Sequence, residues 1–240
     1  MDIATGGKVT PIGAARPGSS GIKHRSSERF TLMLRVAKLV SSHGEYACVI
    51  RDVSVTGVRL RLFHDLPTER HLVLILANGE SYFIENVWEH ANETGREAGF
   101  RFSAPIDVTA FMTESSRFPK RPVRLAIELP ATLGVREFSS PIVIRDLSQH
   151  GARIESERAL FAGQHLRLKV DRLPQIFASV RWSSAGTYGV VFQNGFRLDE
   201  LAQTIWTLRE SAERTAAKLP AARDRLAPAR PAIAATRRAG

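Results

Sequence analysis

The chain has 240 residues, of which 43% are hydrophobic and 24% charged, and this ordinary globular composition excludes a fibrous or wholly disordered protein. No apolar run approaches the roughly 18 residues that a membrane-spanning helix needs, and no apolar segment follows a basic start, so neither a membrane span nor a secretory signal is predicted. The single cysteine, Cys48, excludes an intrachain disulfide and a multi-cysteine zinc site, and we expect a cytoplasmic protein.

The net charge of +10 is concentrated at the two ends of the chain. Residues 1–29 carry +3 and residues 211–240 carry +5, which leaves only +2 for the rest. Both ends lack apolar surface to bury, so we expect them to be disordered. A nucleic-acid binder would need stacking aromatic side chains among these charges, and only Phe30 and Trp206 stand near the borders. Sequence-specific nucleic-acid binding is therefore not expected.

Alternating apolar and polar residues predict short β-strands along most of the chain. In the first half, a further apolar run at 72–76 leads into Asn78-Gly79, a sequence typical of a tight hairpin turn. The predicted inward positions are Leu32, Leu34, Val36, Val58, Leu60 and Leu62 in the first half, and Leu125, Ile127, Leu129, Leu166, Leu168 and Val170 in the second.

Two helices are predicted, each after one half of the chain. Asp107 is the predicted N-cap of a short helix, and Asp199 is the predicted N-cap of a longer one that ends before Pro220. The longer helix carries an apolar stripe that includes Ile205 and Trp206. We expect the stripe to pack against its own barrel, and an interface with a partner is the alternative.

An internal repeat organises the strands. Three landmarks recur in the same order with nearly constant spacing, which indicates two copies of one domain rather than a solenoid. The matching pairs are 51–60 with 145–154, Val87-Trp88 with Arg181-Trp182, and the Gly-aromatic strands 98–102 with 188–192, at offsets of 94, 94 and 90. Short strands at regular spacing predict a small closed barrel or sandwich in each copy.

The repeated segment contains Asp-x-Ser-x-x-Gly, where a strand ends. Asp and Ser side chains can bind nearby backbone N–H groups, and a Gly three positions later permits a turn with positive φ. A structural turn between strands is therefore the simplest interpretation, and its recurrence in phase with the other landmarks exceeds chance. The two occurrences comprise Asp52, Ser54 and Gly57 in the first copy, and Asp146, Ser148 and Gly151 in the second.

A pair of arginines precedes the first strand, with the spacing Arg25-x-x-x-Arg29. Each guanidinium offers paired planar donors that suit phosphate oxygens or the Hoogsteen edge of guanine. Arg117 and Arg121 have the same spacing before the second copy. Aligning the strand alternation instead places Lys120 opposite Arg29, and the sequence leaves these two registers open.

Together these motifs resemble the PilZ domain, the bacterial receptor module for cyclic di-GMP, over about residues 23–113 and 114–197. The resemblance implies two six-stranded β-barrels, that is, an all-β fold. It also implies a non-catalytic receptor whose arginine pair grips phosphates and guanines, while the Asp-x-Ser-x-x-Gly turn presents side-chain and backbone groups to a guanine. The implied ligand residues are Arg25, Arg29, Asp52, Ser54 and Gly57, with a possible second site at Arg117, Arg121, Asp146, Ser148 and Gly151.

No enzyme is expected, because the histidines lack metal-ligand spacing and neither a phosphate-binding loop nor a nucleophile elbow occurs. We expect no metal and no cofactor, with cyclic di-GMP as ligand and a downstream protein as partner. In the alternative interpretation, the chain is a PilZ-fold interaction scaffold that no longer binds the nucleotide. The predicted segments are a disordered tail at 1–22, barrels at 23–113 and 114–198, a helix at 199–218 and a basic disordered tail at 219–240.

Overall fold

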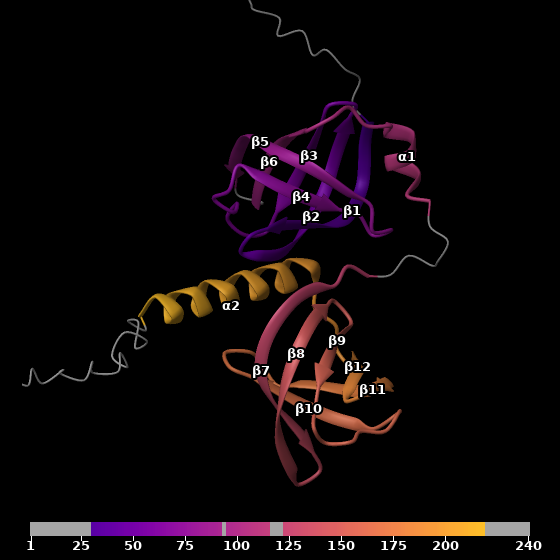
Figure 1. The fold of residues 1–240 in the computed structure, drawn as a ribbon, viewed down its shortest axis with the longest axis vertical. Helices are drawn as coiled ribbons and strands as arrows, with labels where there is room; N and C mark the ends of the chain where they lie inside the picture. Colours follow the sequence, from indigo (N-terminus) through magenta and orange to yellow (C-terminus); the bar gives the residue numbers. More distant parts are fainter. Residues whose placement is uncertain (1–29, 93–94, 116–121, 219–240) are drawn as a thin grey trace, which may run out of the picture.

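A computed structural model of the chain describes residues 30–92, 95–115 and 122–218, and these form two closed β-barrels and two helices (Figure 1). The predicted tails at 1–22 and 219–240 lie outside the described residues. The first barrel consists of β1 (Phe30–Ser41), β2 (Gly44–Ser54), β3 (Gly57–Leu62), β4 (His71–Ile75), β5 (Ser81–Asn92) and β6 (Gly95–Phe102), followed by α1 (Val108–Thr113). The second consists of β7 (Leu125–Val135), β8 (Phe138–Ser148), β9 (Gly151–Glu155), β10 (His165–Val170), β11 (Ile176–Ser184) and β12 (Thr187–Phe192), followed by α2 (Leu198–Lys218).

The two barrels have the same topology. Around the first barrel the strands follow the order β1-β2-β3-β6-β5-β4, and around the second the order β7-β8-β9-β12-β11-β10, with every pair antiparallel. Closure pairs the first strand of each copy with the fourth and leaves no unpaired edge. The predicted all-β fold with two six-stranded barrels is therefore confirmed.

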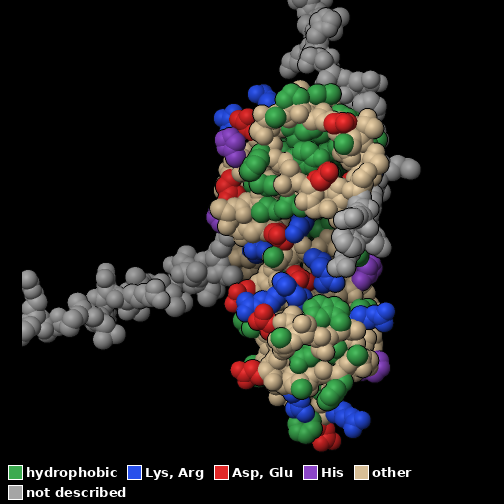
Figure 2. Space-filling model, turned by 45° about the vertical axis from the view of Figure 1, so that its right-hand side comes forward, with side chains coloured by type: hydrophobic (Ala, Val, Ile, Leu, Met, Phe, Trp, Pro, Cys, Tyr) green, Lys and Arg blue, Asp and Glu red, His purple; other side chains and the backbone are tan. Residues whose placement is uncertain are grey.

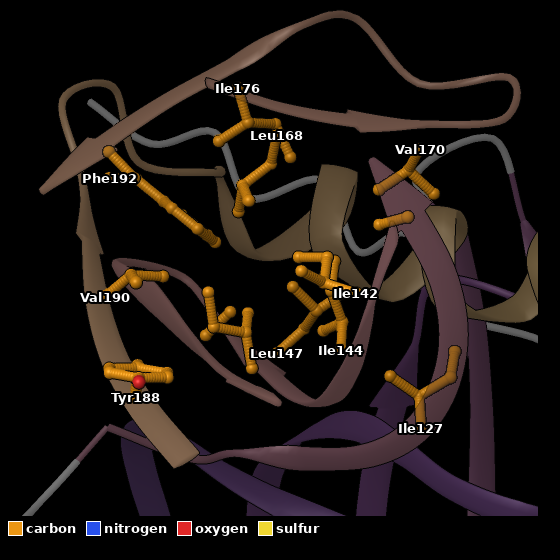
Figure 3. Packing of buried hydrophobic residues seen from close by; sticks show 14 of the residues in the cluster. Ile127, Ile142, Ile144, Leu147, Leu168, Val170, Ile176, Tyr188, Val190 and Phe192 are labelled. Atoms are coloured by element: carbon orange, nitrogen blue, oxygen red, sulfur yellow. The ribbon is translucent and has the colours of Figure 1, made fainter. Parts of the chain in front are cut away.

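Inward-facing apolar side chains fill each barrel, as the alternation predicts. Figure 3 shows this packing in the second barrel, where labelled side chains such as Ile144, Leu168 and Val190 point toward a common centre. The fully buried side chains of the first barrel include Leu60, Leu62 and Leu74, and those of the second include Leu125, Ile144 and Ile154.

The first strand departs from the predicted pattern. In the part of β1 whose side chains are described, Ala37 and Leu39 are buried, whereas Val36 is only half-buried. The register between β1 and β2 shifts between Thr31 and Arg35, and such an irregularity changes which residues face inward. The prediction of Val36 as an inward residue is therefore wrong.

Helix α1 is held at both ends. Asp107 caps its start as predicted, because the Oδ1 atom accepts a hydrogen bond from the Thr109 N–H at 2.8 Å. At the other end, Nη1 of Arg35 donates to the carbonyl oxygen of Phe111 at 3.2 Å and pairs with the Glu114 carboxylate at 3.2 Å. A guanidinium at a helix C-terminus satisfies carbonyls that have no partner within the helix.

Helix α2 begins two residues earlier than an N-cap at Asp199 requires. Its first residue is Leu198, so Asp199 lies in the first turn and its carboxylate pairs with Arg197 at 3.2 Å. The Glu200 carboxylate accepts a hydrogen bond from the Arg197 N–H at 2.9 Å, and this contact satisfies the helix start. The predicted N-cap is therefore wrong, although the helix itself is confirmed and is described over Leu198–Lys218.

Helix α2 lies between the two barrels (Figure 1). Leu201 and Ile205 pack into the apolar cluster of the second barrel, as expected, and Ala47 from β2 of the first barrel belongs to the same cluster. Five consecutive residues of β2, Tyr46–Ile50, are buried, which requires cover on both faces of the strand. The barrel core covers one face, and α2 and β7 cover the other.

Candidate functional site

Each Asp-x-Ser-x-x-Gly motif forms the turn between the second and third strands of its barrel. Asp52 and Ser54 lie at the end of β2, Gly57 is the first residue of β3, and both polar side chains are buried. The Ser54 hydroxyl donates to the carbonyl oxygen of Gly57 at 3.2 Å, and Ser148 makes the same bond at 3.0 Å in the second copy. The serine therefore closes the turn through a carbonyl group, whereas the sequence predicted a backbone N–H as its partner.

The motif glycines do not have the conformation that the sequence predicted. Neither Gly57 nor Gly151 has a positive φ. A Cβ atom at Gly57 would lie 2.8 Å from the carbonyl oxygen of Phe100, and one at Gly151 would lie 2.2 Å from that of Val190. These positions require glycine because a neighbouring strand passes too close for a side chain.

In the first barrel the motif aspartate begins a row of outward-facing residues that crosses three further strands. The Nε atom of Arg59 lies 2.6 Å from Oδ2 of Asp52, its register partner across the β2–β3 pair. Gly99 on β6 stands opposite Arg59, and Trp88 on β5 stands opposite Gly99. A Cβ at Gly99 would lie 2.0 Å from the indole Nε1, so the indole lies directly over the glycine.

The second barrel carries the same row. Arg153 Nε lies 2.9 Å from Oδ2 of Asp146, Gly189 stands opposite Arg153, and Trp182 stands opposite Gly189. A Cβ at Gly189 would lie 2.0 Å from the Trp182 Nε1, which matches the first copy. The two indoles, in the first and second barrels, are 38% and 42% exposed.

The row combines three chemistries on one barrel wall. The carboxylate accepts hydrogen bonds, the guanidinium donates them, and the indole offers an aromatic face for stacking. Such a set suits an anion that carries a purine base. Sequence reasoning named the aspartates and noticed both tryptophans, but it missed Arg59 and Arg153 as their companions, although these two arginines stand at the same offset of 94.

The predicted arginine pairs, Arg25 with Arg29 and Arg117 with Arg121, lie outside the described residues. The structure instead brings Arg124 to the second motif, where its Nη1 atom lies 2.9 Å from Oδ1 of Asp146. Asp146 is thereby held by two arginines, Arg153 on β9 and Arg124 just before β7.

The strand register explains why Arg124 occupies this place. Asp52 pairs with Thr31 on β1, and Asp146 pairs with Ala126 on β7. Thr31 and Ala126 therefore correspond, at an offset of 95 along the chain. Arg29 precedes Thr31 by two residues, and Arg124 precedes Ala126 by two residues. This offset differs from both registers that the sequence left open. The irregularity in β1 spans one residue more than the one in β7, and a linear comparison cannot show that difference.

A cavity of about 300 Å³ lies between the barrels beside the second motif. Gln149 and His150, which lie between the serine and the glycine of that motif, line it together with the ion pair of Arg35 and Glu114 from the first copy. The full lining comprises Arg35, Val36, Ala77, Glu114, Pro122, Val123, Gln149 and His150. The second motif therefore opens toward residues of the first barrel.

Three further features bear on chemistry. Within the described ranges, no cluster of three or more His, Cys, Asp or Glu side chains could hold a metal ion. Neither described helix combines the length and the apolar character that crossing a bilayer requires. Cys48 is buried in β2, and burial raises the pKa of its thiol to about 12, so this group stays protonated near neutral pH.

Comparisons with known proteins agree with the duplication. The family model of the PilZ domain matches residues 23–118 and 114–206. The PlzA protein of Borreliella burgdorferi, solved in complex with c-di-GMP, is 13% identical with a TM-score of 0.30 over 76% of this chain and 95% of PlzA. YcgR from Escherichia coli, also in complex with c-di-GMP, is 12% identical with a TM-score of 0.28 over 78% of this chain and 88% of YcgR. A search of curated proteins found no match.

Proposed function

The chain belongs to the PilZ domain family, and from this premise we propose that it is a non-catalytic receptor for cyclic di-GMP with one candidate site on each barrel. The observation that carries the proposal is the row of Asp, Arg, Gly and Trp, which both barrels build at the Asp-x-Ser-x-x-Gly turn with nearly identical geometry. A turn with only a structural task would not need an exposed indole and a paired guanidinium beside it.

At the first site, Asp52, Ser54 and Gly57 present the polar turn to a guanine. The Asp52 carboxylate suits the N–H donors on the Watson–Crick edge of guanine, and Arg59 holds it in place. Arg25 and Arg29 precede β1 directly and supply donors for the phosphates and the Hoogsteen edges. Binding would order this entry segment against the barrel, which is a known way of switching a protein.

At the second site, Asp146, Ser148 and Gly151 play the same parts, and Arg124 is the counterpart of Arg29 by the register of the first strands. Arg117 and Arg121 extend the basic segment that leads to this site. The adjacent cavity between the barrels provides room for part of the ligand.

The two sites differ in charge. In the second barrel Arg145, just before the motif aspartate, pairs with Glu128 at 2.8 Å and with Glu155 at 2.7 Å. Glu155 pairs with Val143 across β8 and β9, and at the corresponding place in the first barrel Arg61 pairs with Val49. An arginine thus replaces a glutamate there, so the wall beside the first motif is more basic. A ligand with two phosphate charges therefore favours the first site, because nearby carboxylates repel it at the second.

Calorimetric titration of cyclic di-GMP into the full chain tests the proposal. We expect saturable binding, loss of the tighter site in Arg29→Ala and loss of the weaker site in Arg124→Ala. The matched control is Arg136→Ala, which removes an exposed arginine from the turn between β7 and β8, at the end of the hairpin away from the motif. Absence of binding at high micromolar ligand would overturn the receptor function and leave the interaction scaffold.

A further inference from the structure

The face of α2 that points away from the second barrel contacts the first. The Trp206 indole stacks on the His64 imidazole, with ring centroids 4.8 Å apart and planes 9° apart, and lies 5.4 Å from the Tyr46 ring. Figure 2 shows Lys, Arg, Asp and Glu side chains gathered across the middle of one face of the molecule, where the two barrels meet. The contact between barrels is therefore both aromatic and charged.

Arg209, one turn of α2 after Trp206, joins three separate segments. Its Nη1 atom donates to the carbonyl oxygen of His43 in the first barrel at 2.9 Å, and its Nη2 atom donates to the carbonyl oxygen of Ala126 in β7. The guanidinium also lies against Gly44, where a Cβ atom would be 2.0 Å from Nη1. The absence of a side chain at Gly44 thus creates the seat for this arginine.

Glu45 completes the contact from the first barrel. Its Oε2 atom accepts a hydrogen bond from the Ala126 N–H at 2.6 Å, while Oε1 pairs with Lys38 at 3.0 Å. Both backbone groups of Ala126 are thus bound by side chains from outside β7. We call Glu45 and Arg209 the inter-barrel clamp.

The clamped residue lies beside the second motif. Ala126 is the register partner of Asp146, and it stands at the β7 irregularity, where the strand ladder is interrupted. Arg124, two residues earlier on the same segment, pairs with Asp146 at 2.9 Å. A shift of this part of β7 would therefore move a ligand-binding arginine relative to the motif carboxylate.

We propose that Arg209 and Glu45 are positioning residues for the second nucleotide site: by holding Ala126 they fix Arg124 against Asp146, so that affinity at the second motif depends on the docking of the two barrels. The inference rests on the proposed function. Because coupling between two events is reciprocal, ligand at the second motif strengthens the docking by the same factor. The C-terminal helix is in this way part of the second site without touching the ligand.

The test is calorimetric titration of cyclic di-GMP into full-length chains in an Arg29→Ala background, which isolates the second site. Arg209→Ala is expected to weaken binding by roughly tenfold. Arg209→Lys is expected to weaken it less, because lysine keeps the charge but loses the paired planar donors. Gly44→Ala, which displaces the guanidinium without removing it, should act in the same direction as Arg209→Ala.

The matched control is Arg172→Ala, which removes an arginine that binds Ser211 of α2 at 2.8 Å and lies outside the clamp. The Arg172→Ala variant is expected to bind cyclic di-GMP with the same affinity as the Arg29→Ala chain. Equal affinities in the Arg209→Ala chain and this control would overturn the inference, as would a wild type that binds only at the first motif. A wild type that binds no ligand at all would overturn the proposed function itself, so the two failures are distinguishable.

Discussion

The Nε atom of Arg59 lies 2.6 Å from the carboxylate of Asp52, so the motif aspartate forms an ion pair with its register partner on the next strand. The same pair recurs between Arg153 and Asp146 at 2.9 Å. A carboxylate that is buried among strands costs free energy unless it is compensated, and this arginine supplies part of that compensation. The site is therefore preorganised by its own barrel wall, which lowers the cost of ordering it around a ligand.

Replacement of Arg59 by alanine should destabilise the first barrel and also weaken its site. Asp52 is only 6% exposed, and loss of a charged partner at such a position costs about 1–3 kcal/mol. Urea denaturation would measure the change in the free energy of unfolding, with Arg101→Ala, an exposed arginine on β6, as the control. Equal stability of the two variants would show that Arg59 does not support the carboxylate.

The motif glycines should tolerate alanine differently in the two copies. The added Cβ would lie 2.2 Å from a backbone oxygen at Gly151 but 2.8 Å from one at Gly57, so the second barrel must shift more. We expect Gly151→Ala to lose about 2–3 kcal/mol and Gly57→Ala about 1–2 kcal/mol, because overpacking against backbone cannot be relieved by a rotamer change. The urea midpoints of both variants show which substitution destabilises the chain more. A larger loss in Gly57→Ala than in Gly151→Ala would contradict the explanation by backbone clash.

The repeat and the strand alternation were sufficient to predict two barrels, because each inward position repeats at a period of two and each copy keeps the same landmarks. Residues such as Leu60 and Ile154 face the core for this local reason. The continuous apolar run Tyr46–Ile50 also carried a readable signal, since a strand that is apolar on both faces needs cover on both. In the structure α2 and β7 provide the second cover, so the run marks the contact between barrels.

Other features depend on contacts far apart in the sequence. The offset that brings Arg124 to Asp146 comes from irregularities of unequal length in β1 and β7, which leave no mark in composition. The need for glycine at Gly57 comes from Phe100 on another strand, so positive φ was the wrong reason for a correctly identified residue. The sequence places Trp206 in a stripe that is expected to pack against the second barrel, whereas its indole stacks on His64 of the first barrel.

Cys48 offers a chemical probe of the first barrel. Its thiol is buried, with a pKa raised to about 12, so at pH 8 roughly one molecule in ten thousand carries the reactive thiolate. We expect no labelling by an aromatic disulfide reagent in the native chain and complete labelling in urea. Labelling of the native chain at the rate of the unfolded chain would show that β2 opens readily.

His64 should make the stability of the chain depend on pH. Burial, the largest influence, lowers the pKa of this imidazole below its usual 6.5; the Asp65 carboxylate opposes this shift and Arg96 adds to it. The unfolded chain therefore takes up a proton near pH 6.5 while the folded chain does not. The contribution of neutral His64 is fully present above pH 6.5 and is lost as the pH falls toward the lowered pKa, by at most about 1.4 kcal/mol per pH unit.

Urea denaturation at pH 7.5 and pH 5.5 would measure this loss in the wild type and in His64→Phe. Phenylalanine keeps an aromatic ring against Trp206 but cannot be protonated, so its stability should fall less between the two pH values. Groups that titrate in both chains cancel in the difference between them. Equal losses in the two chains would mean that the buried imidazole contributes nothing to the pH dependence. A smaller loss in His64→Phe would assign part of the acid sensitivity to the contact between α2 and the first barrel.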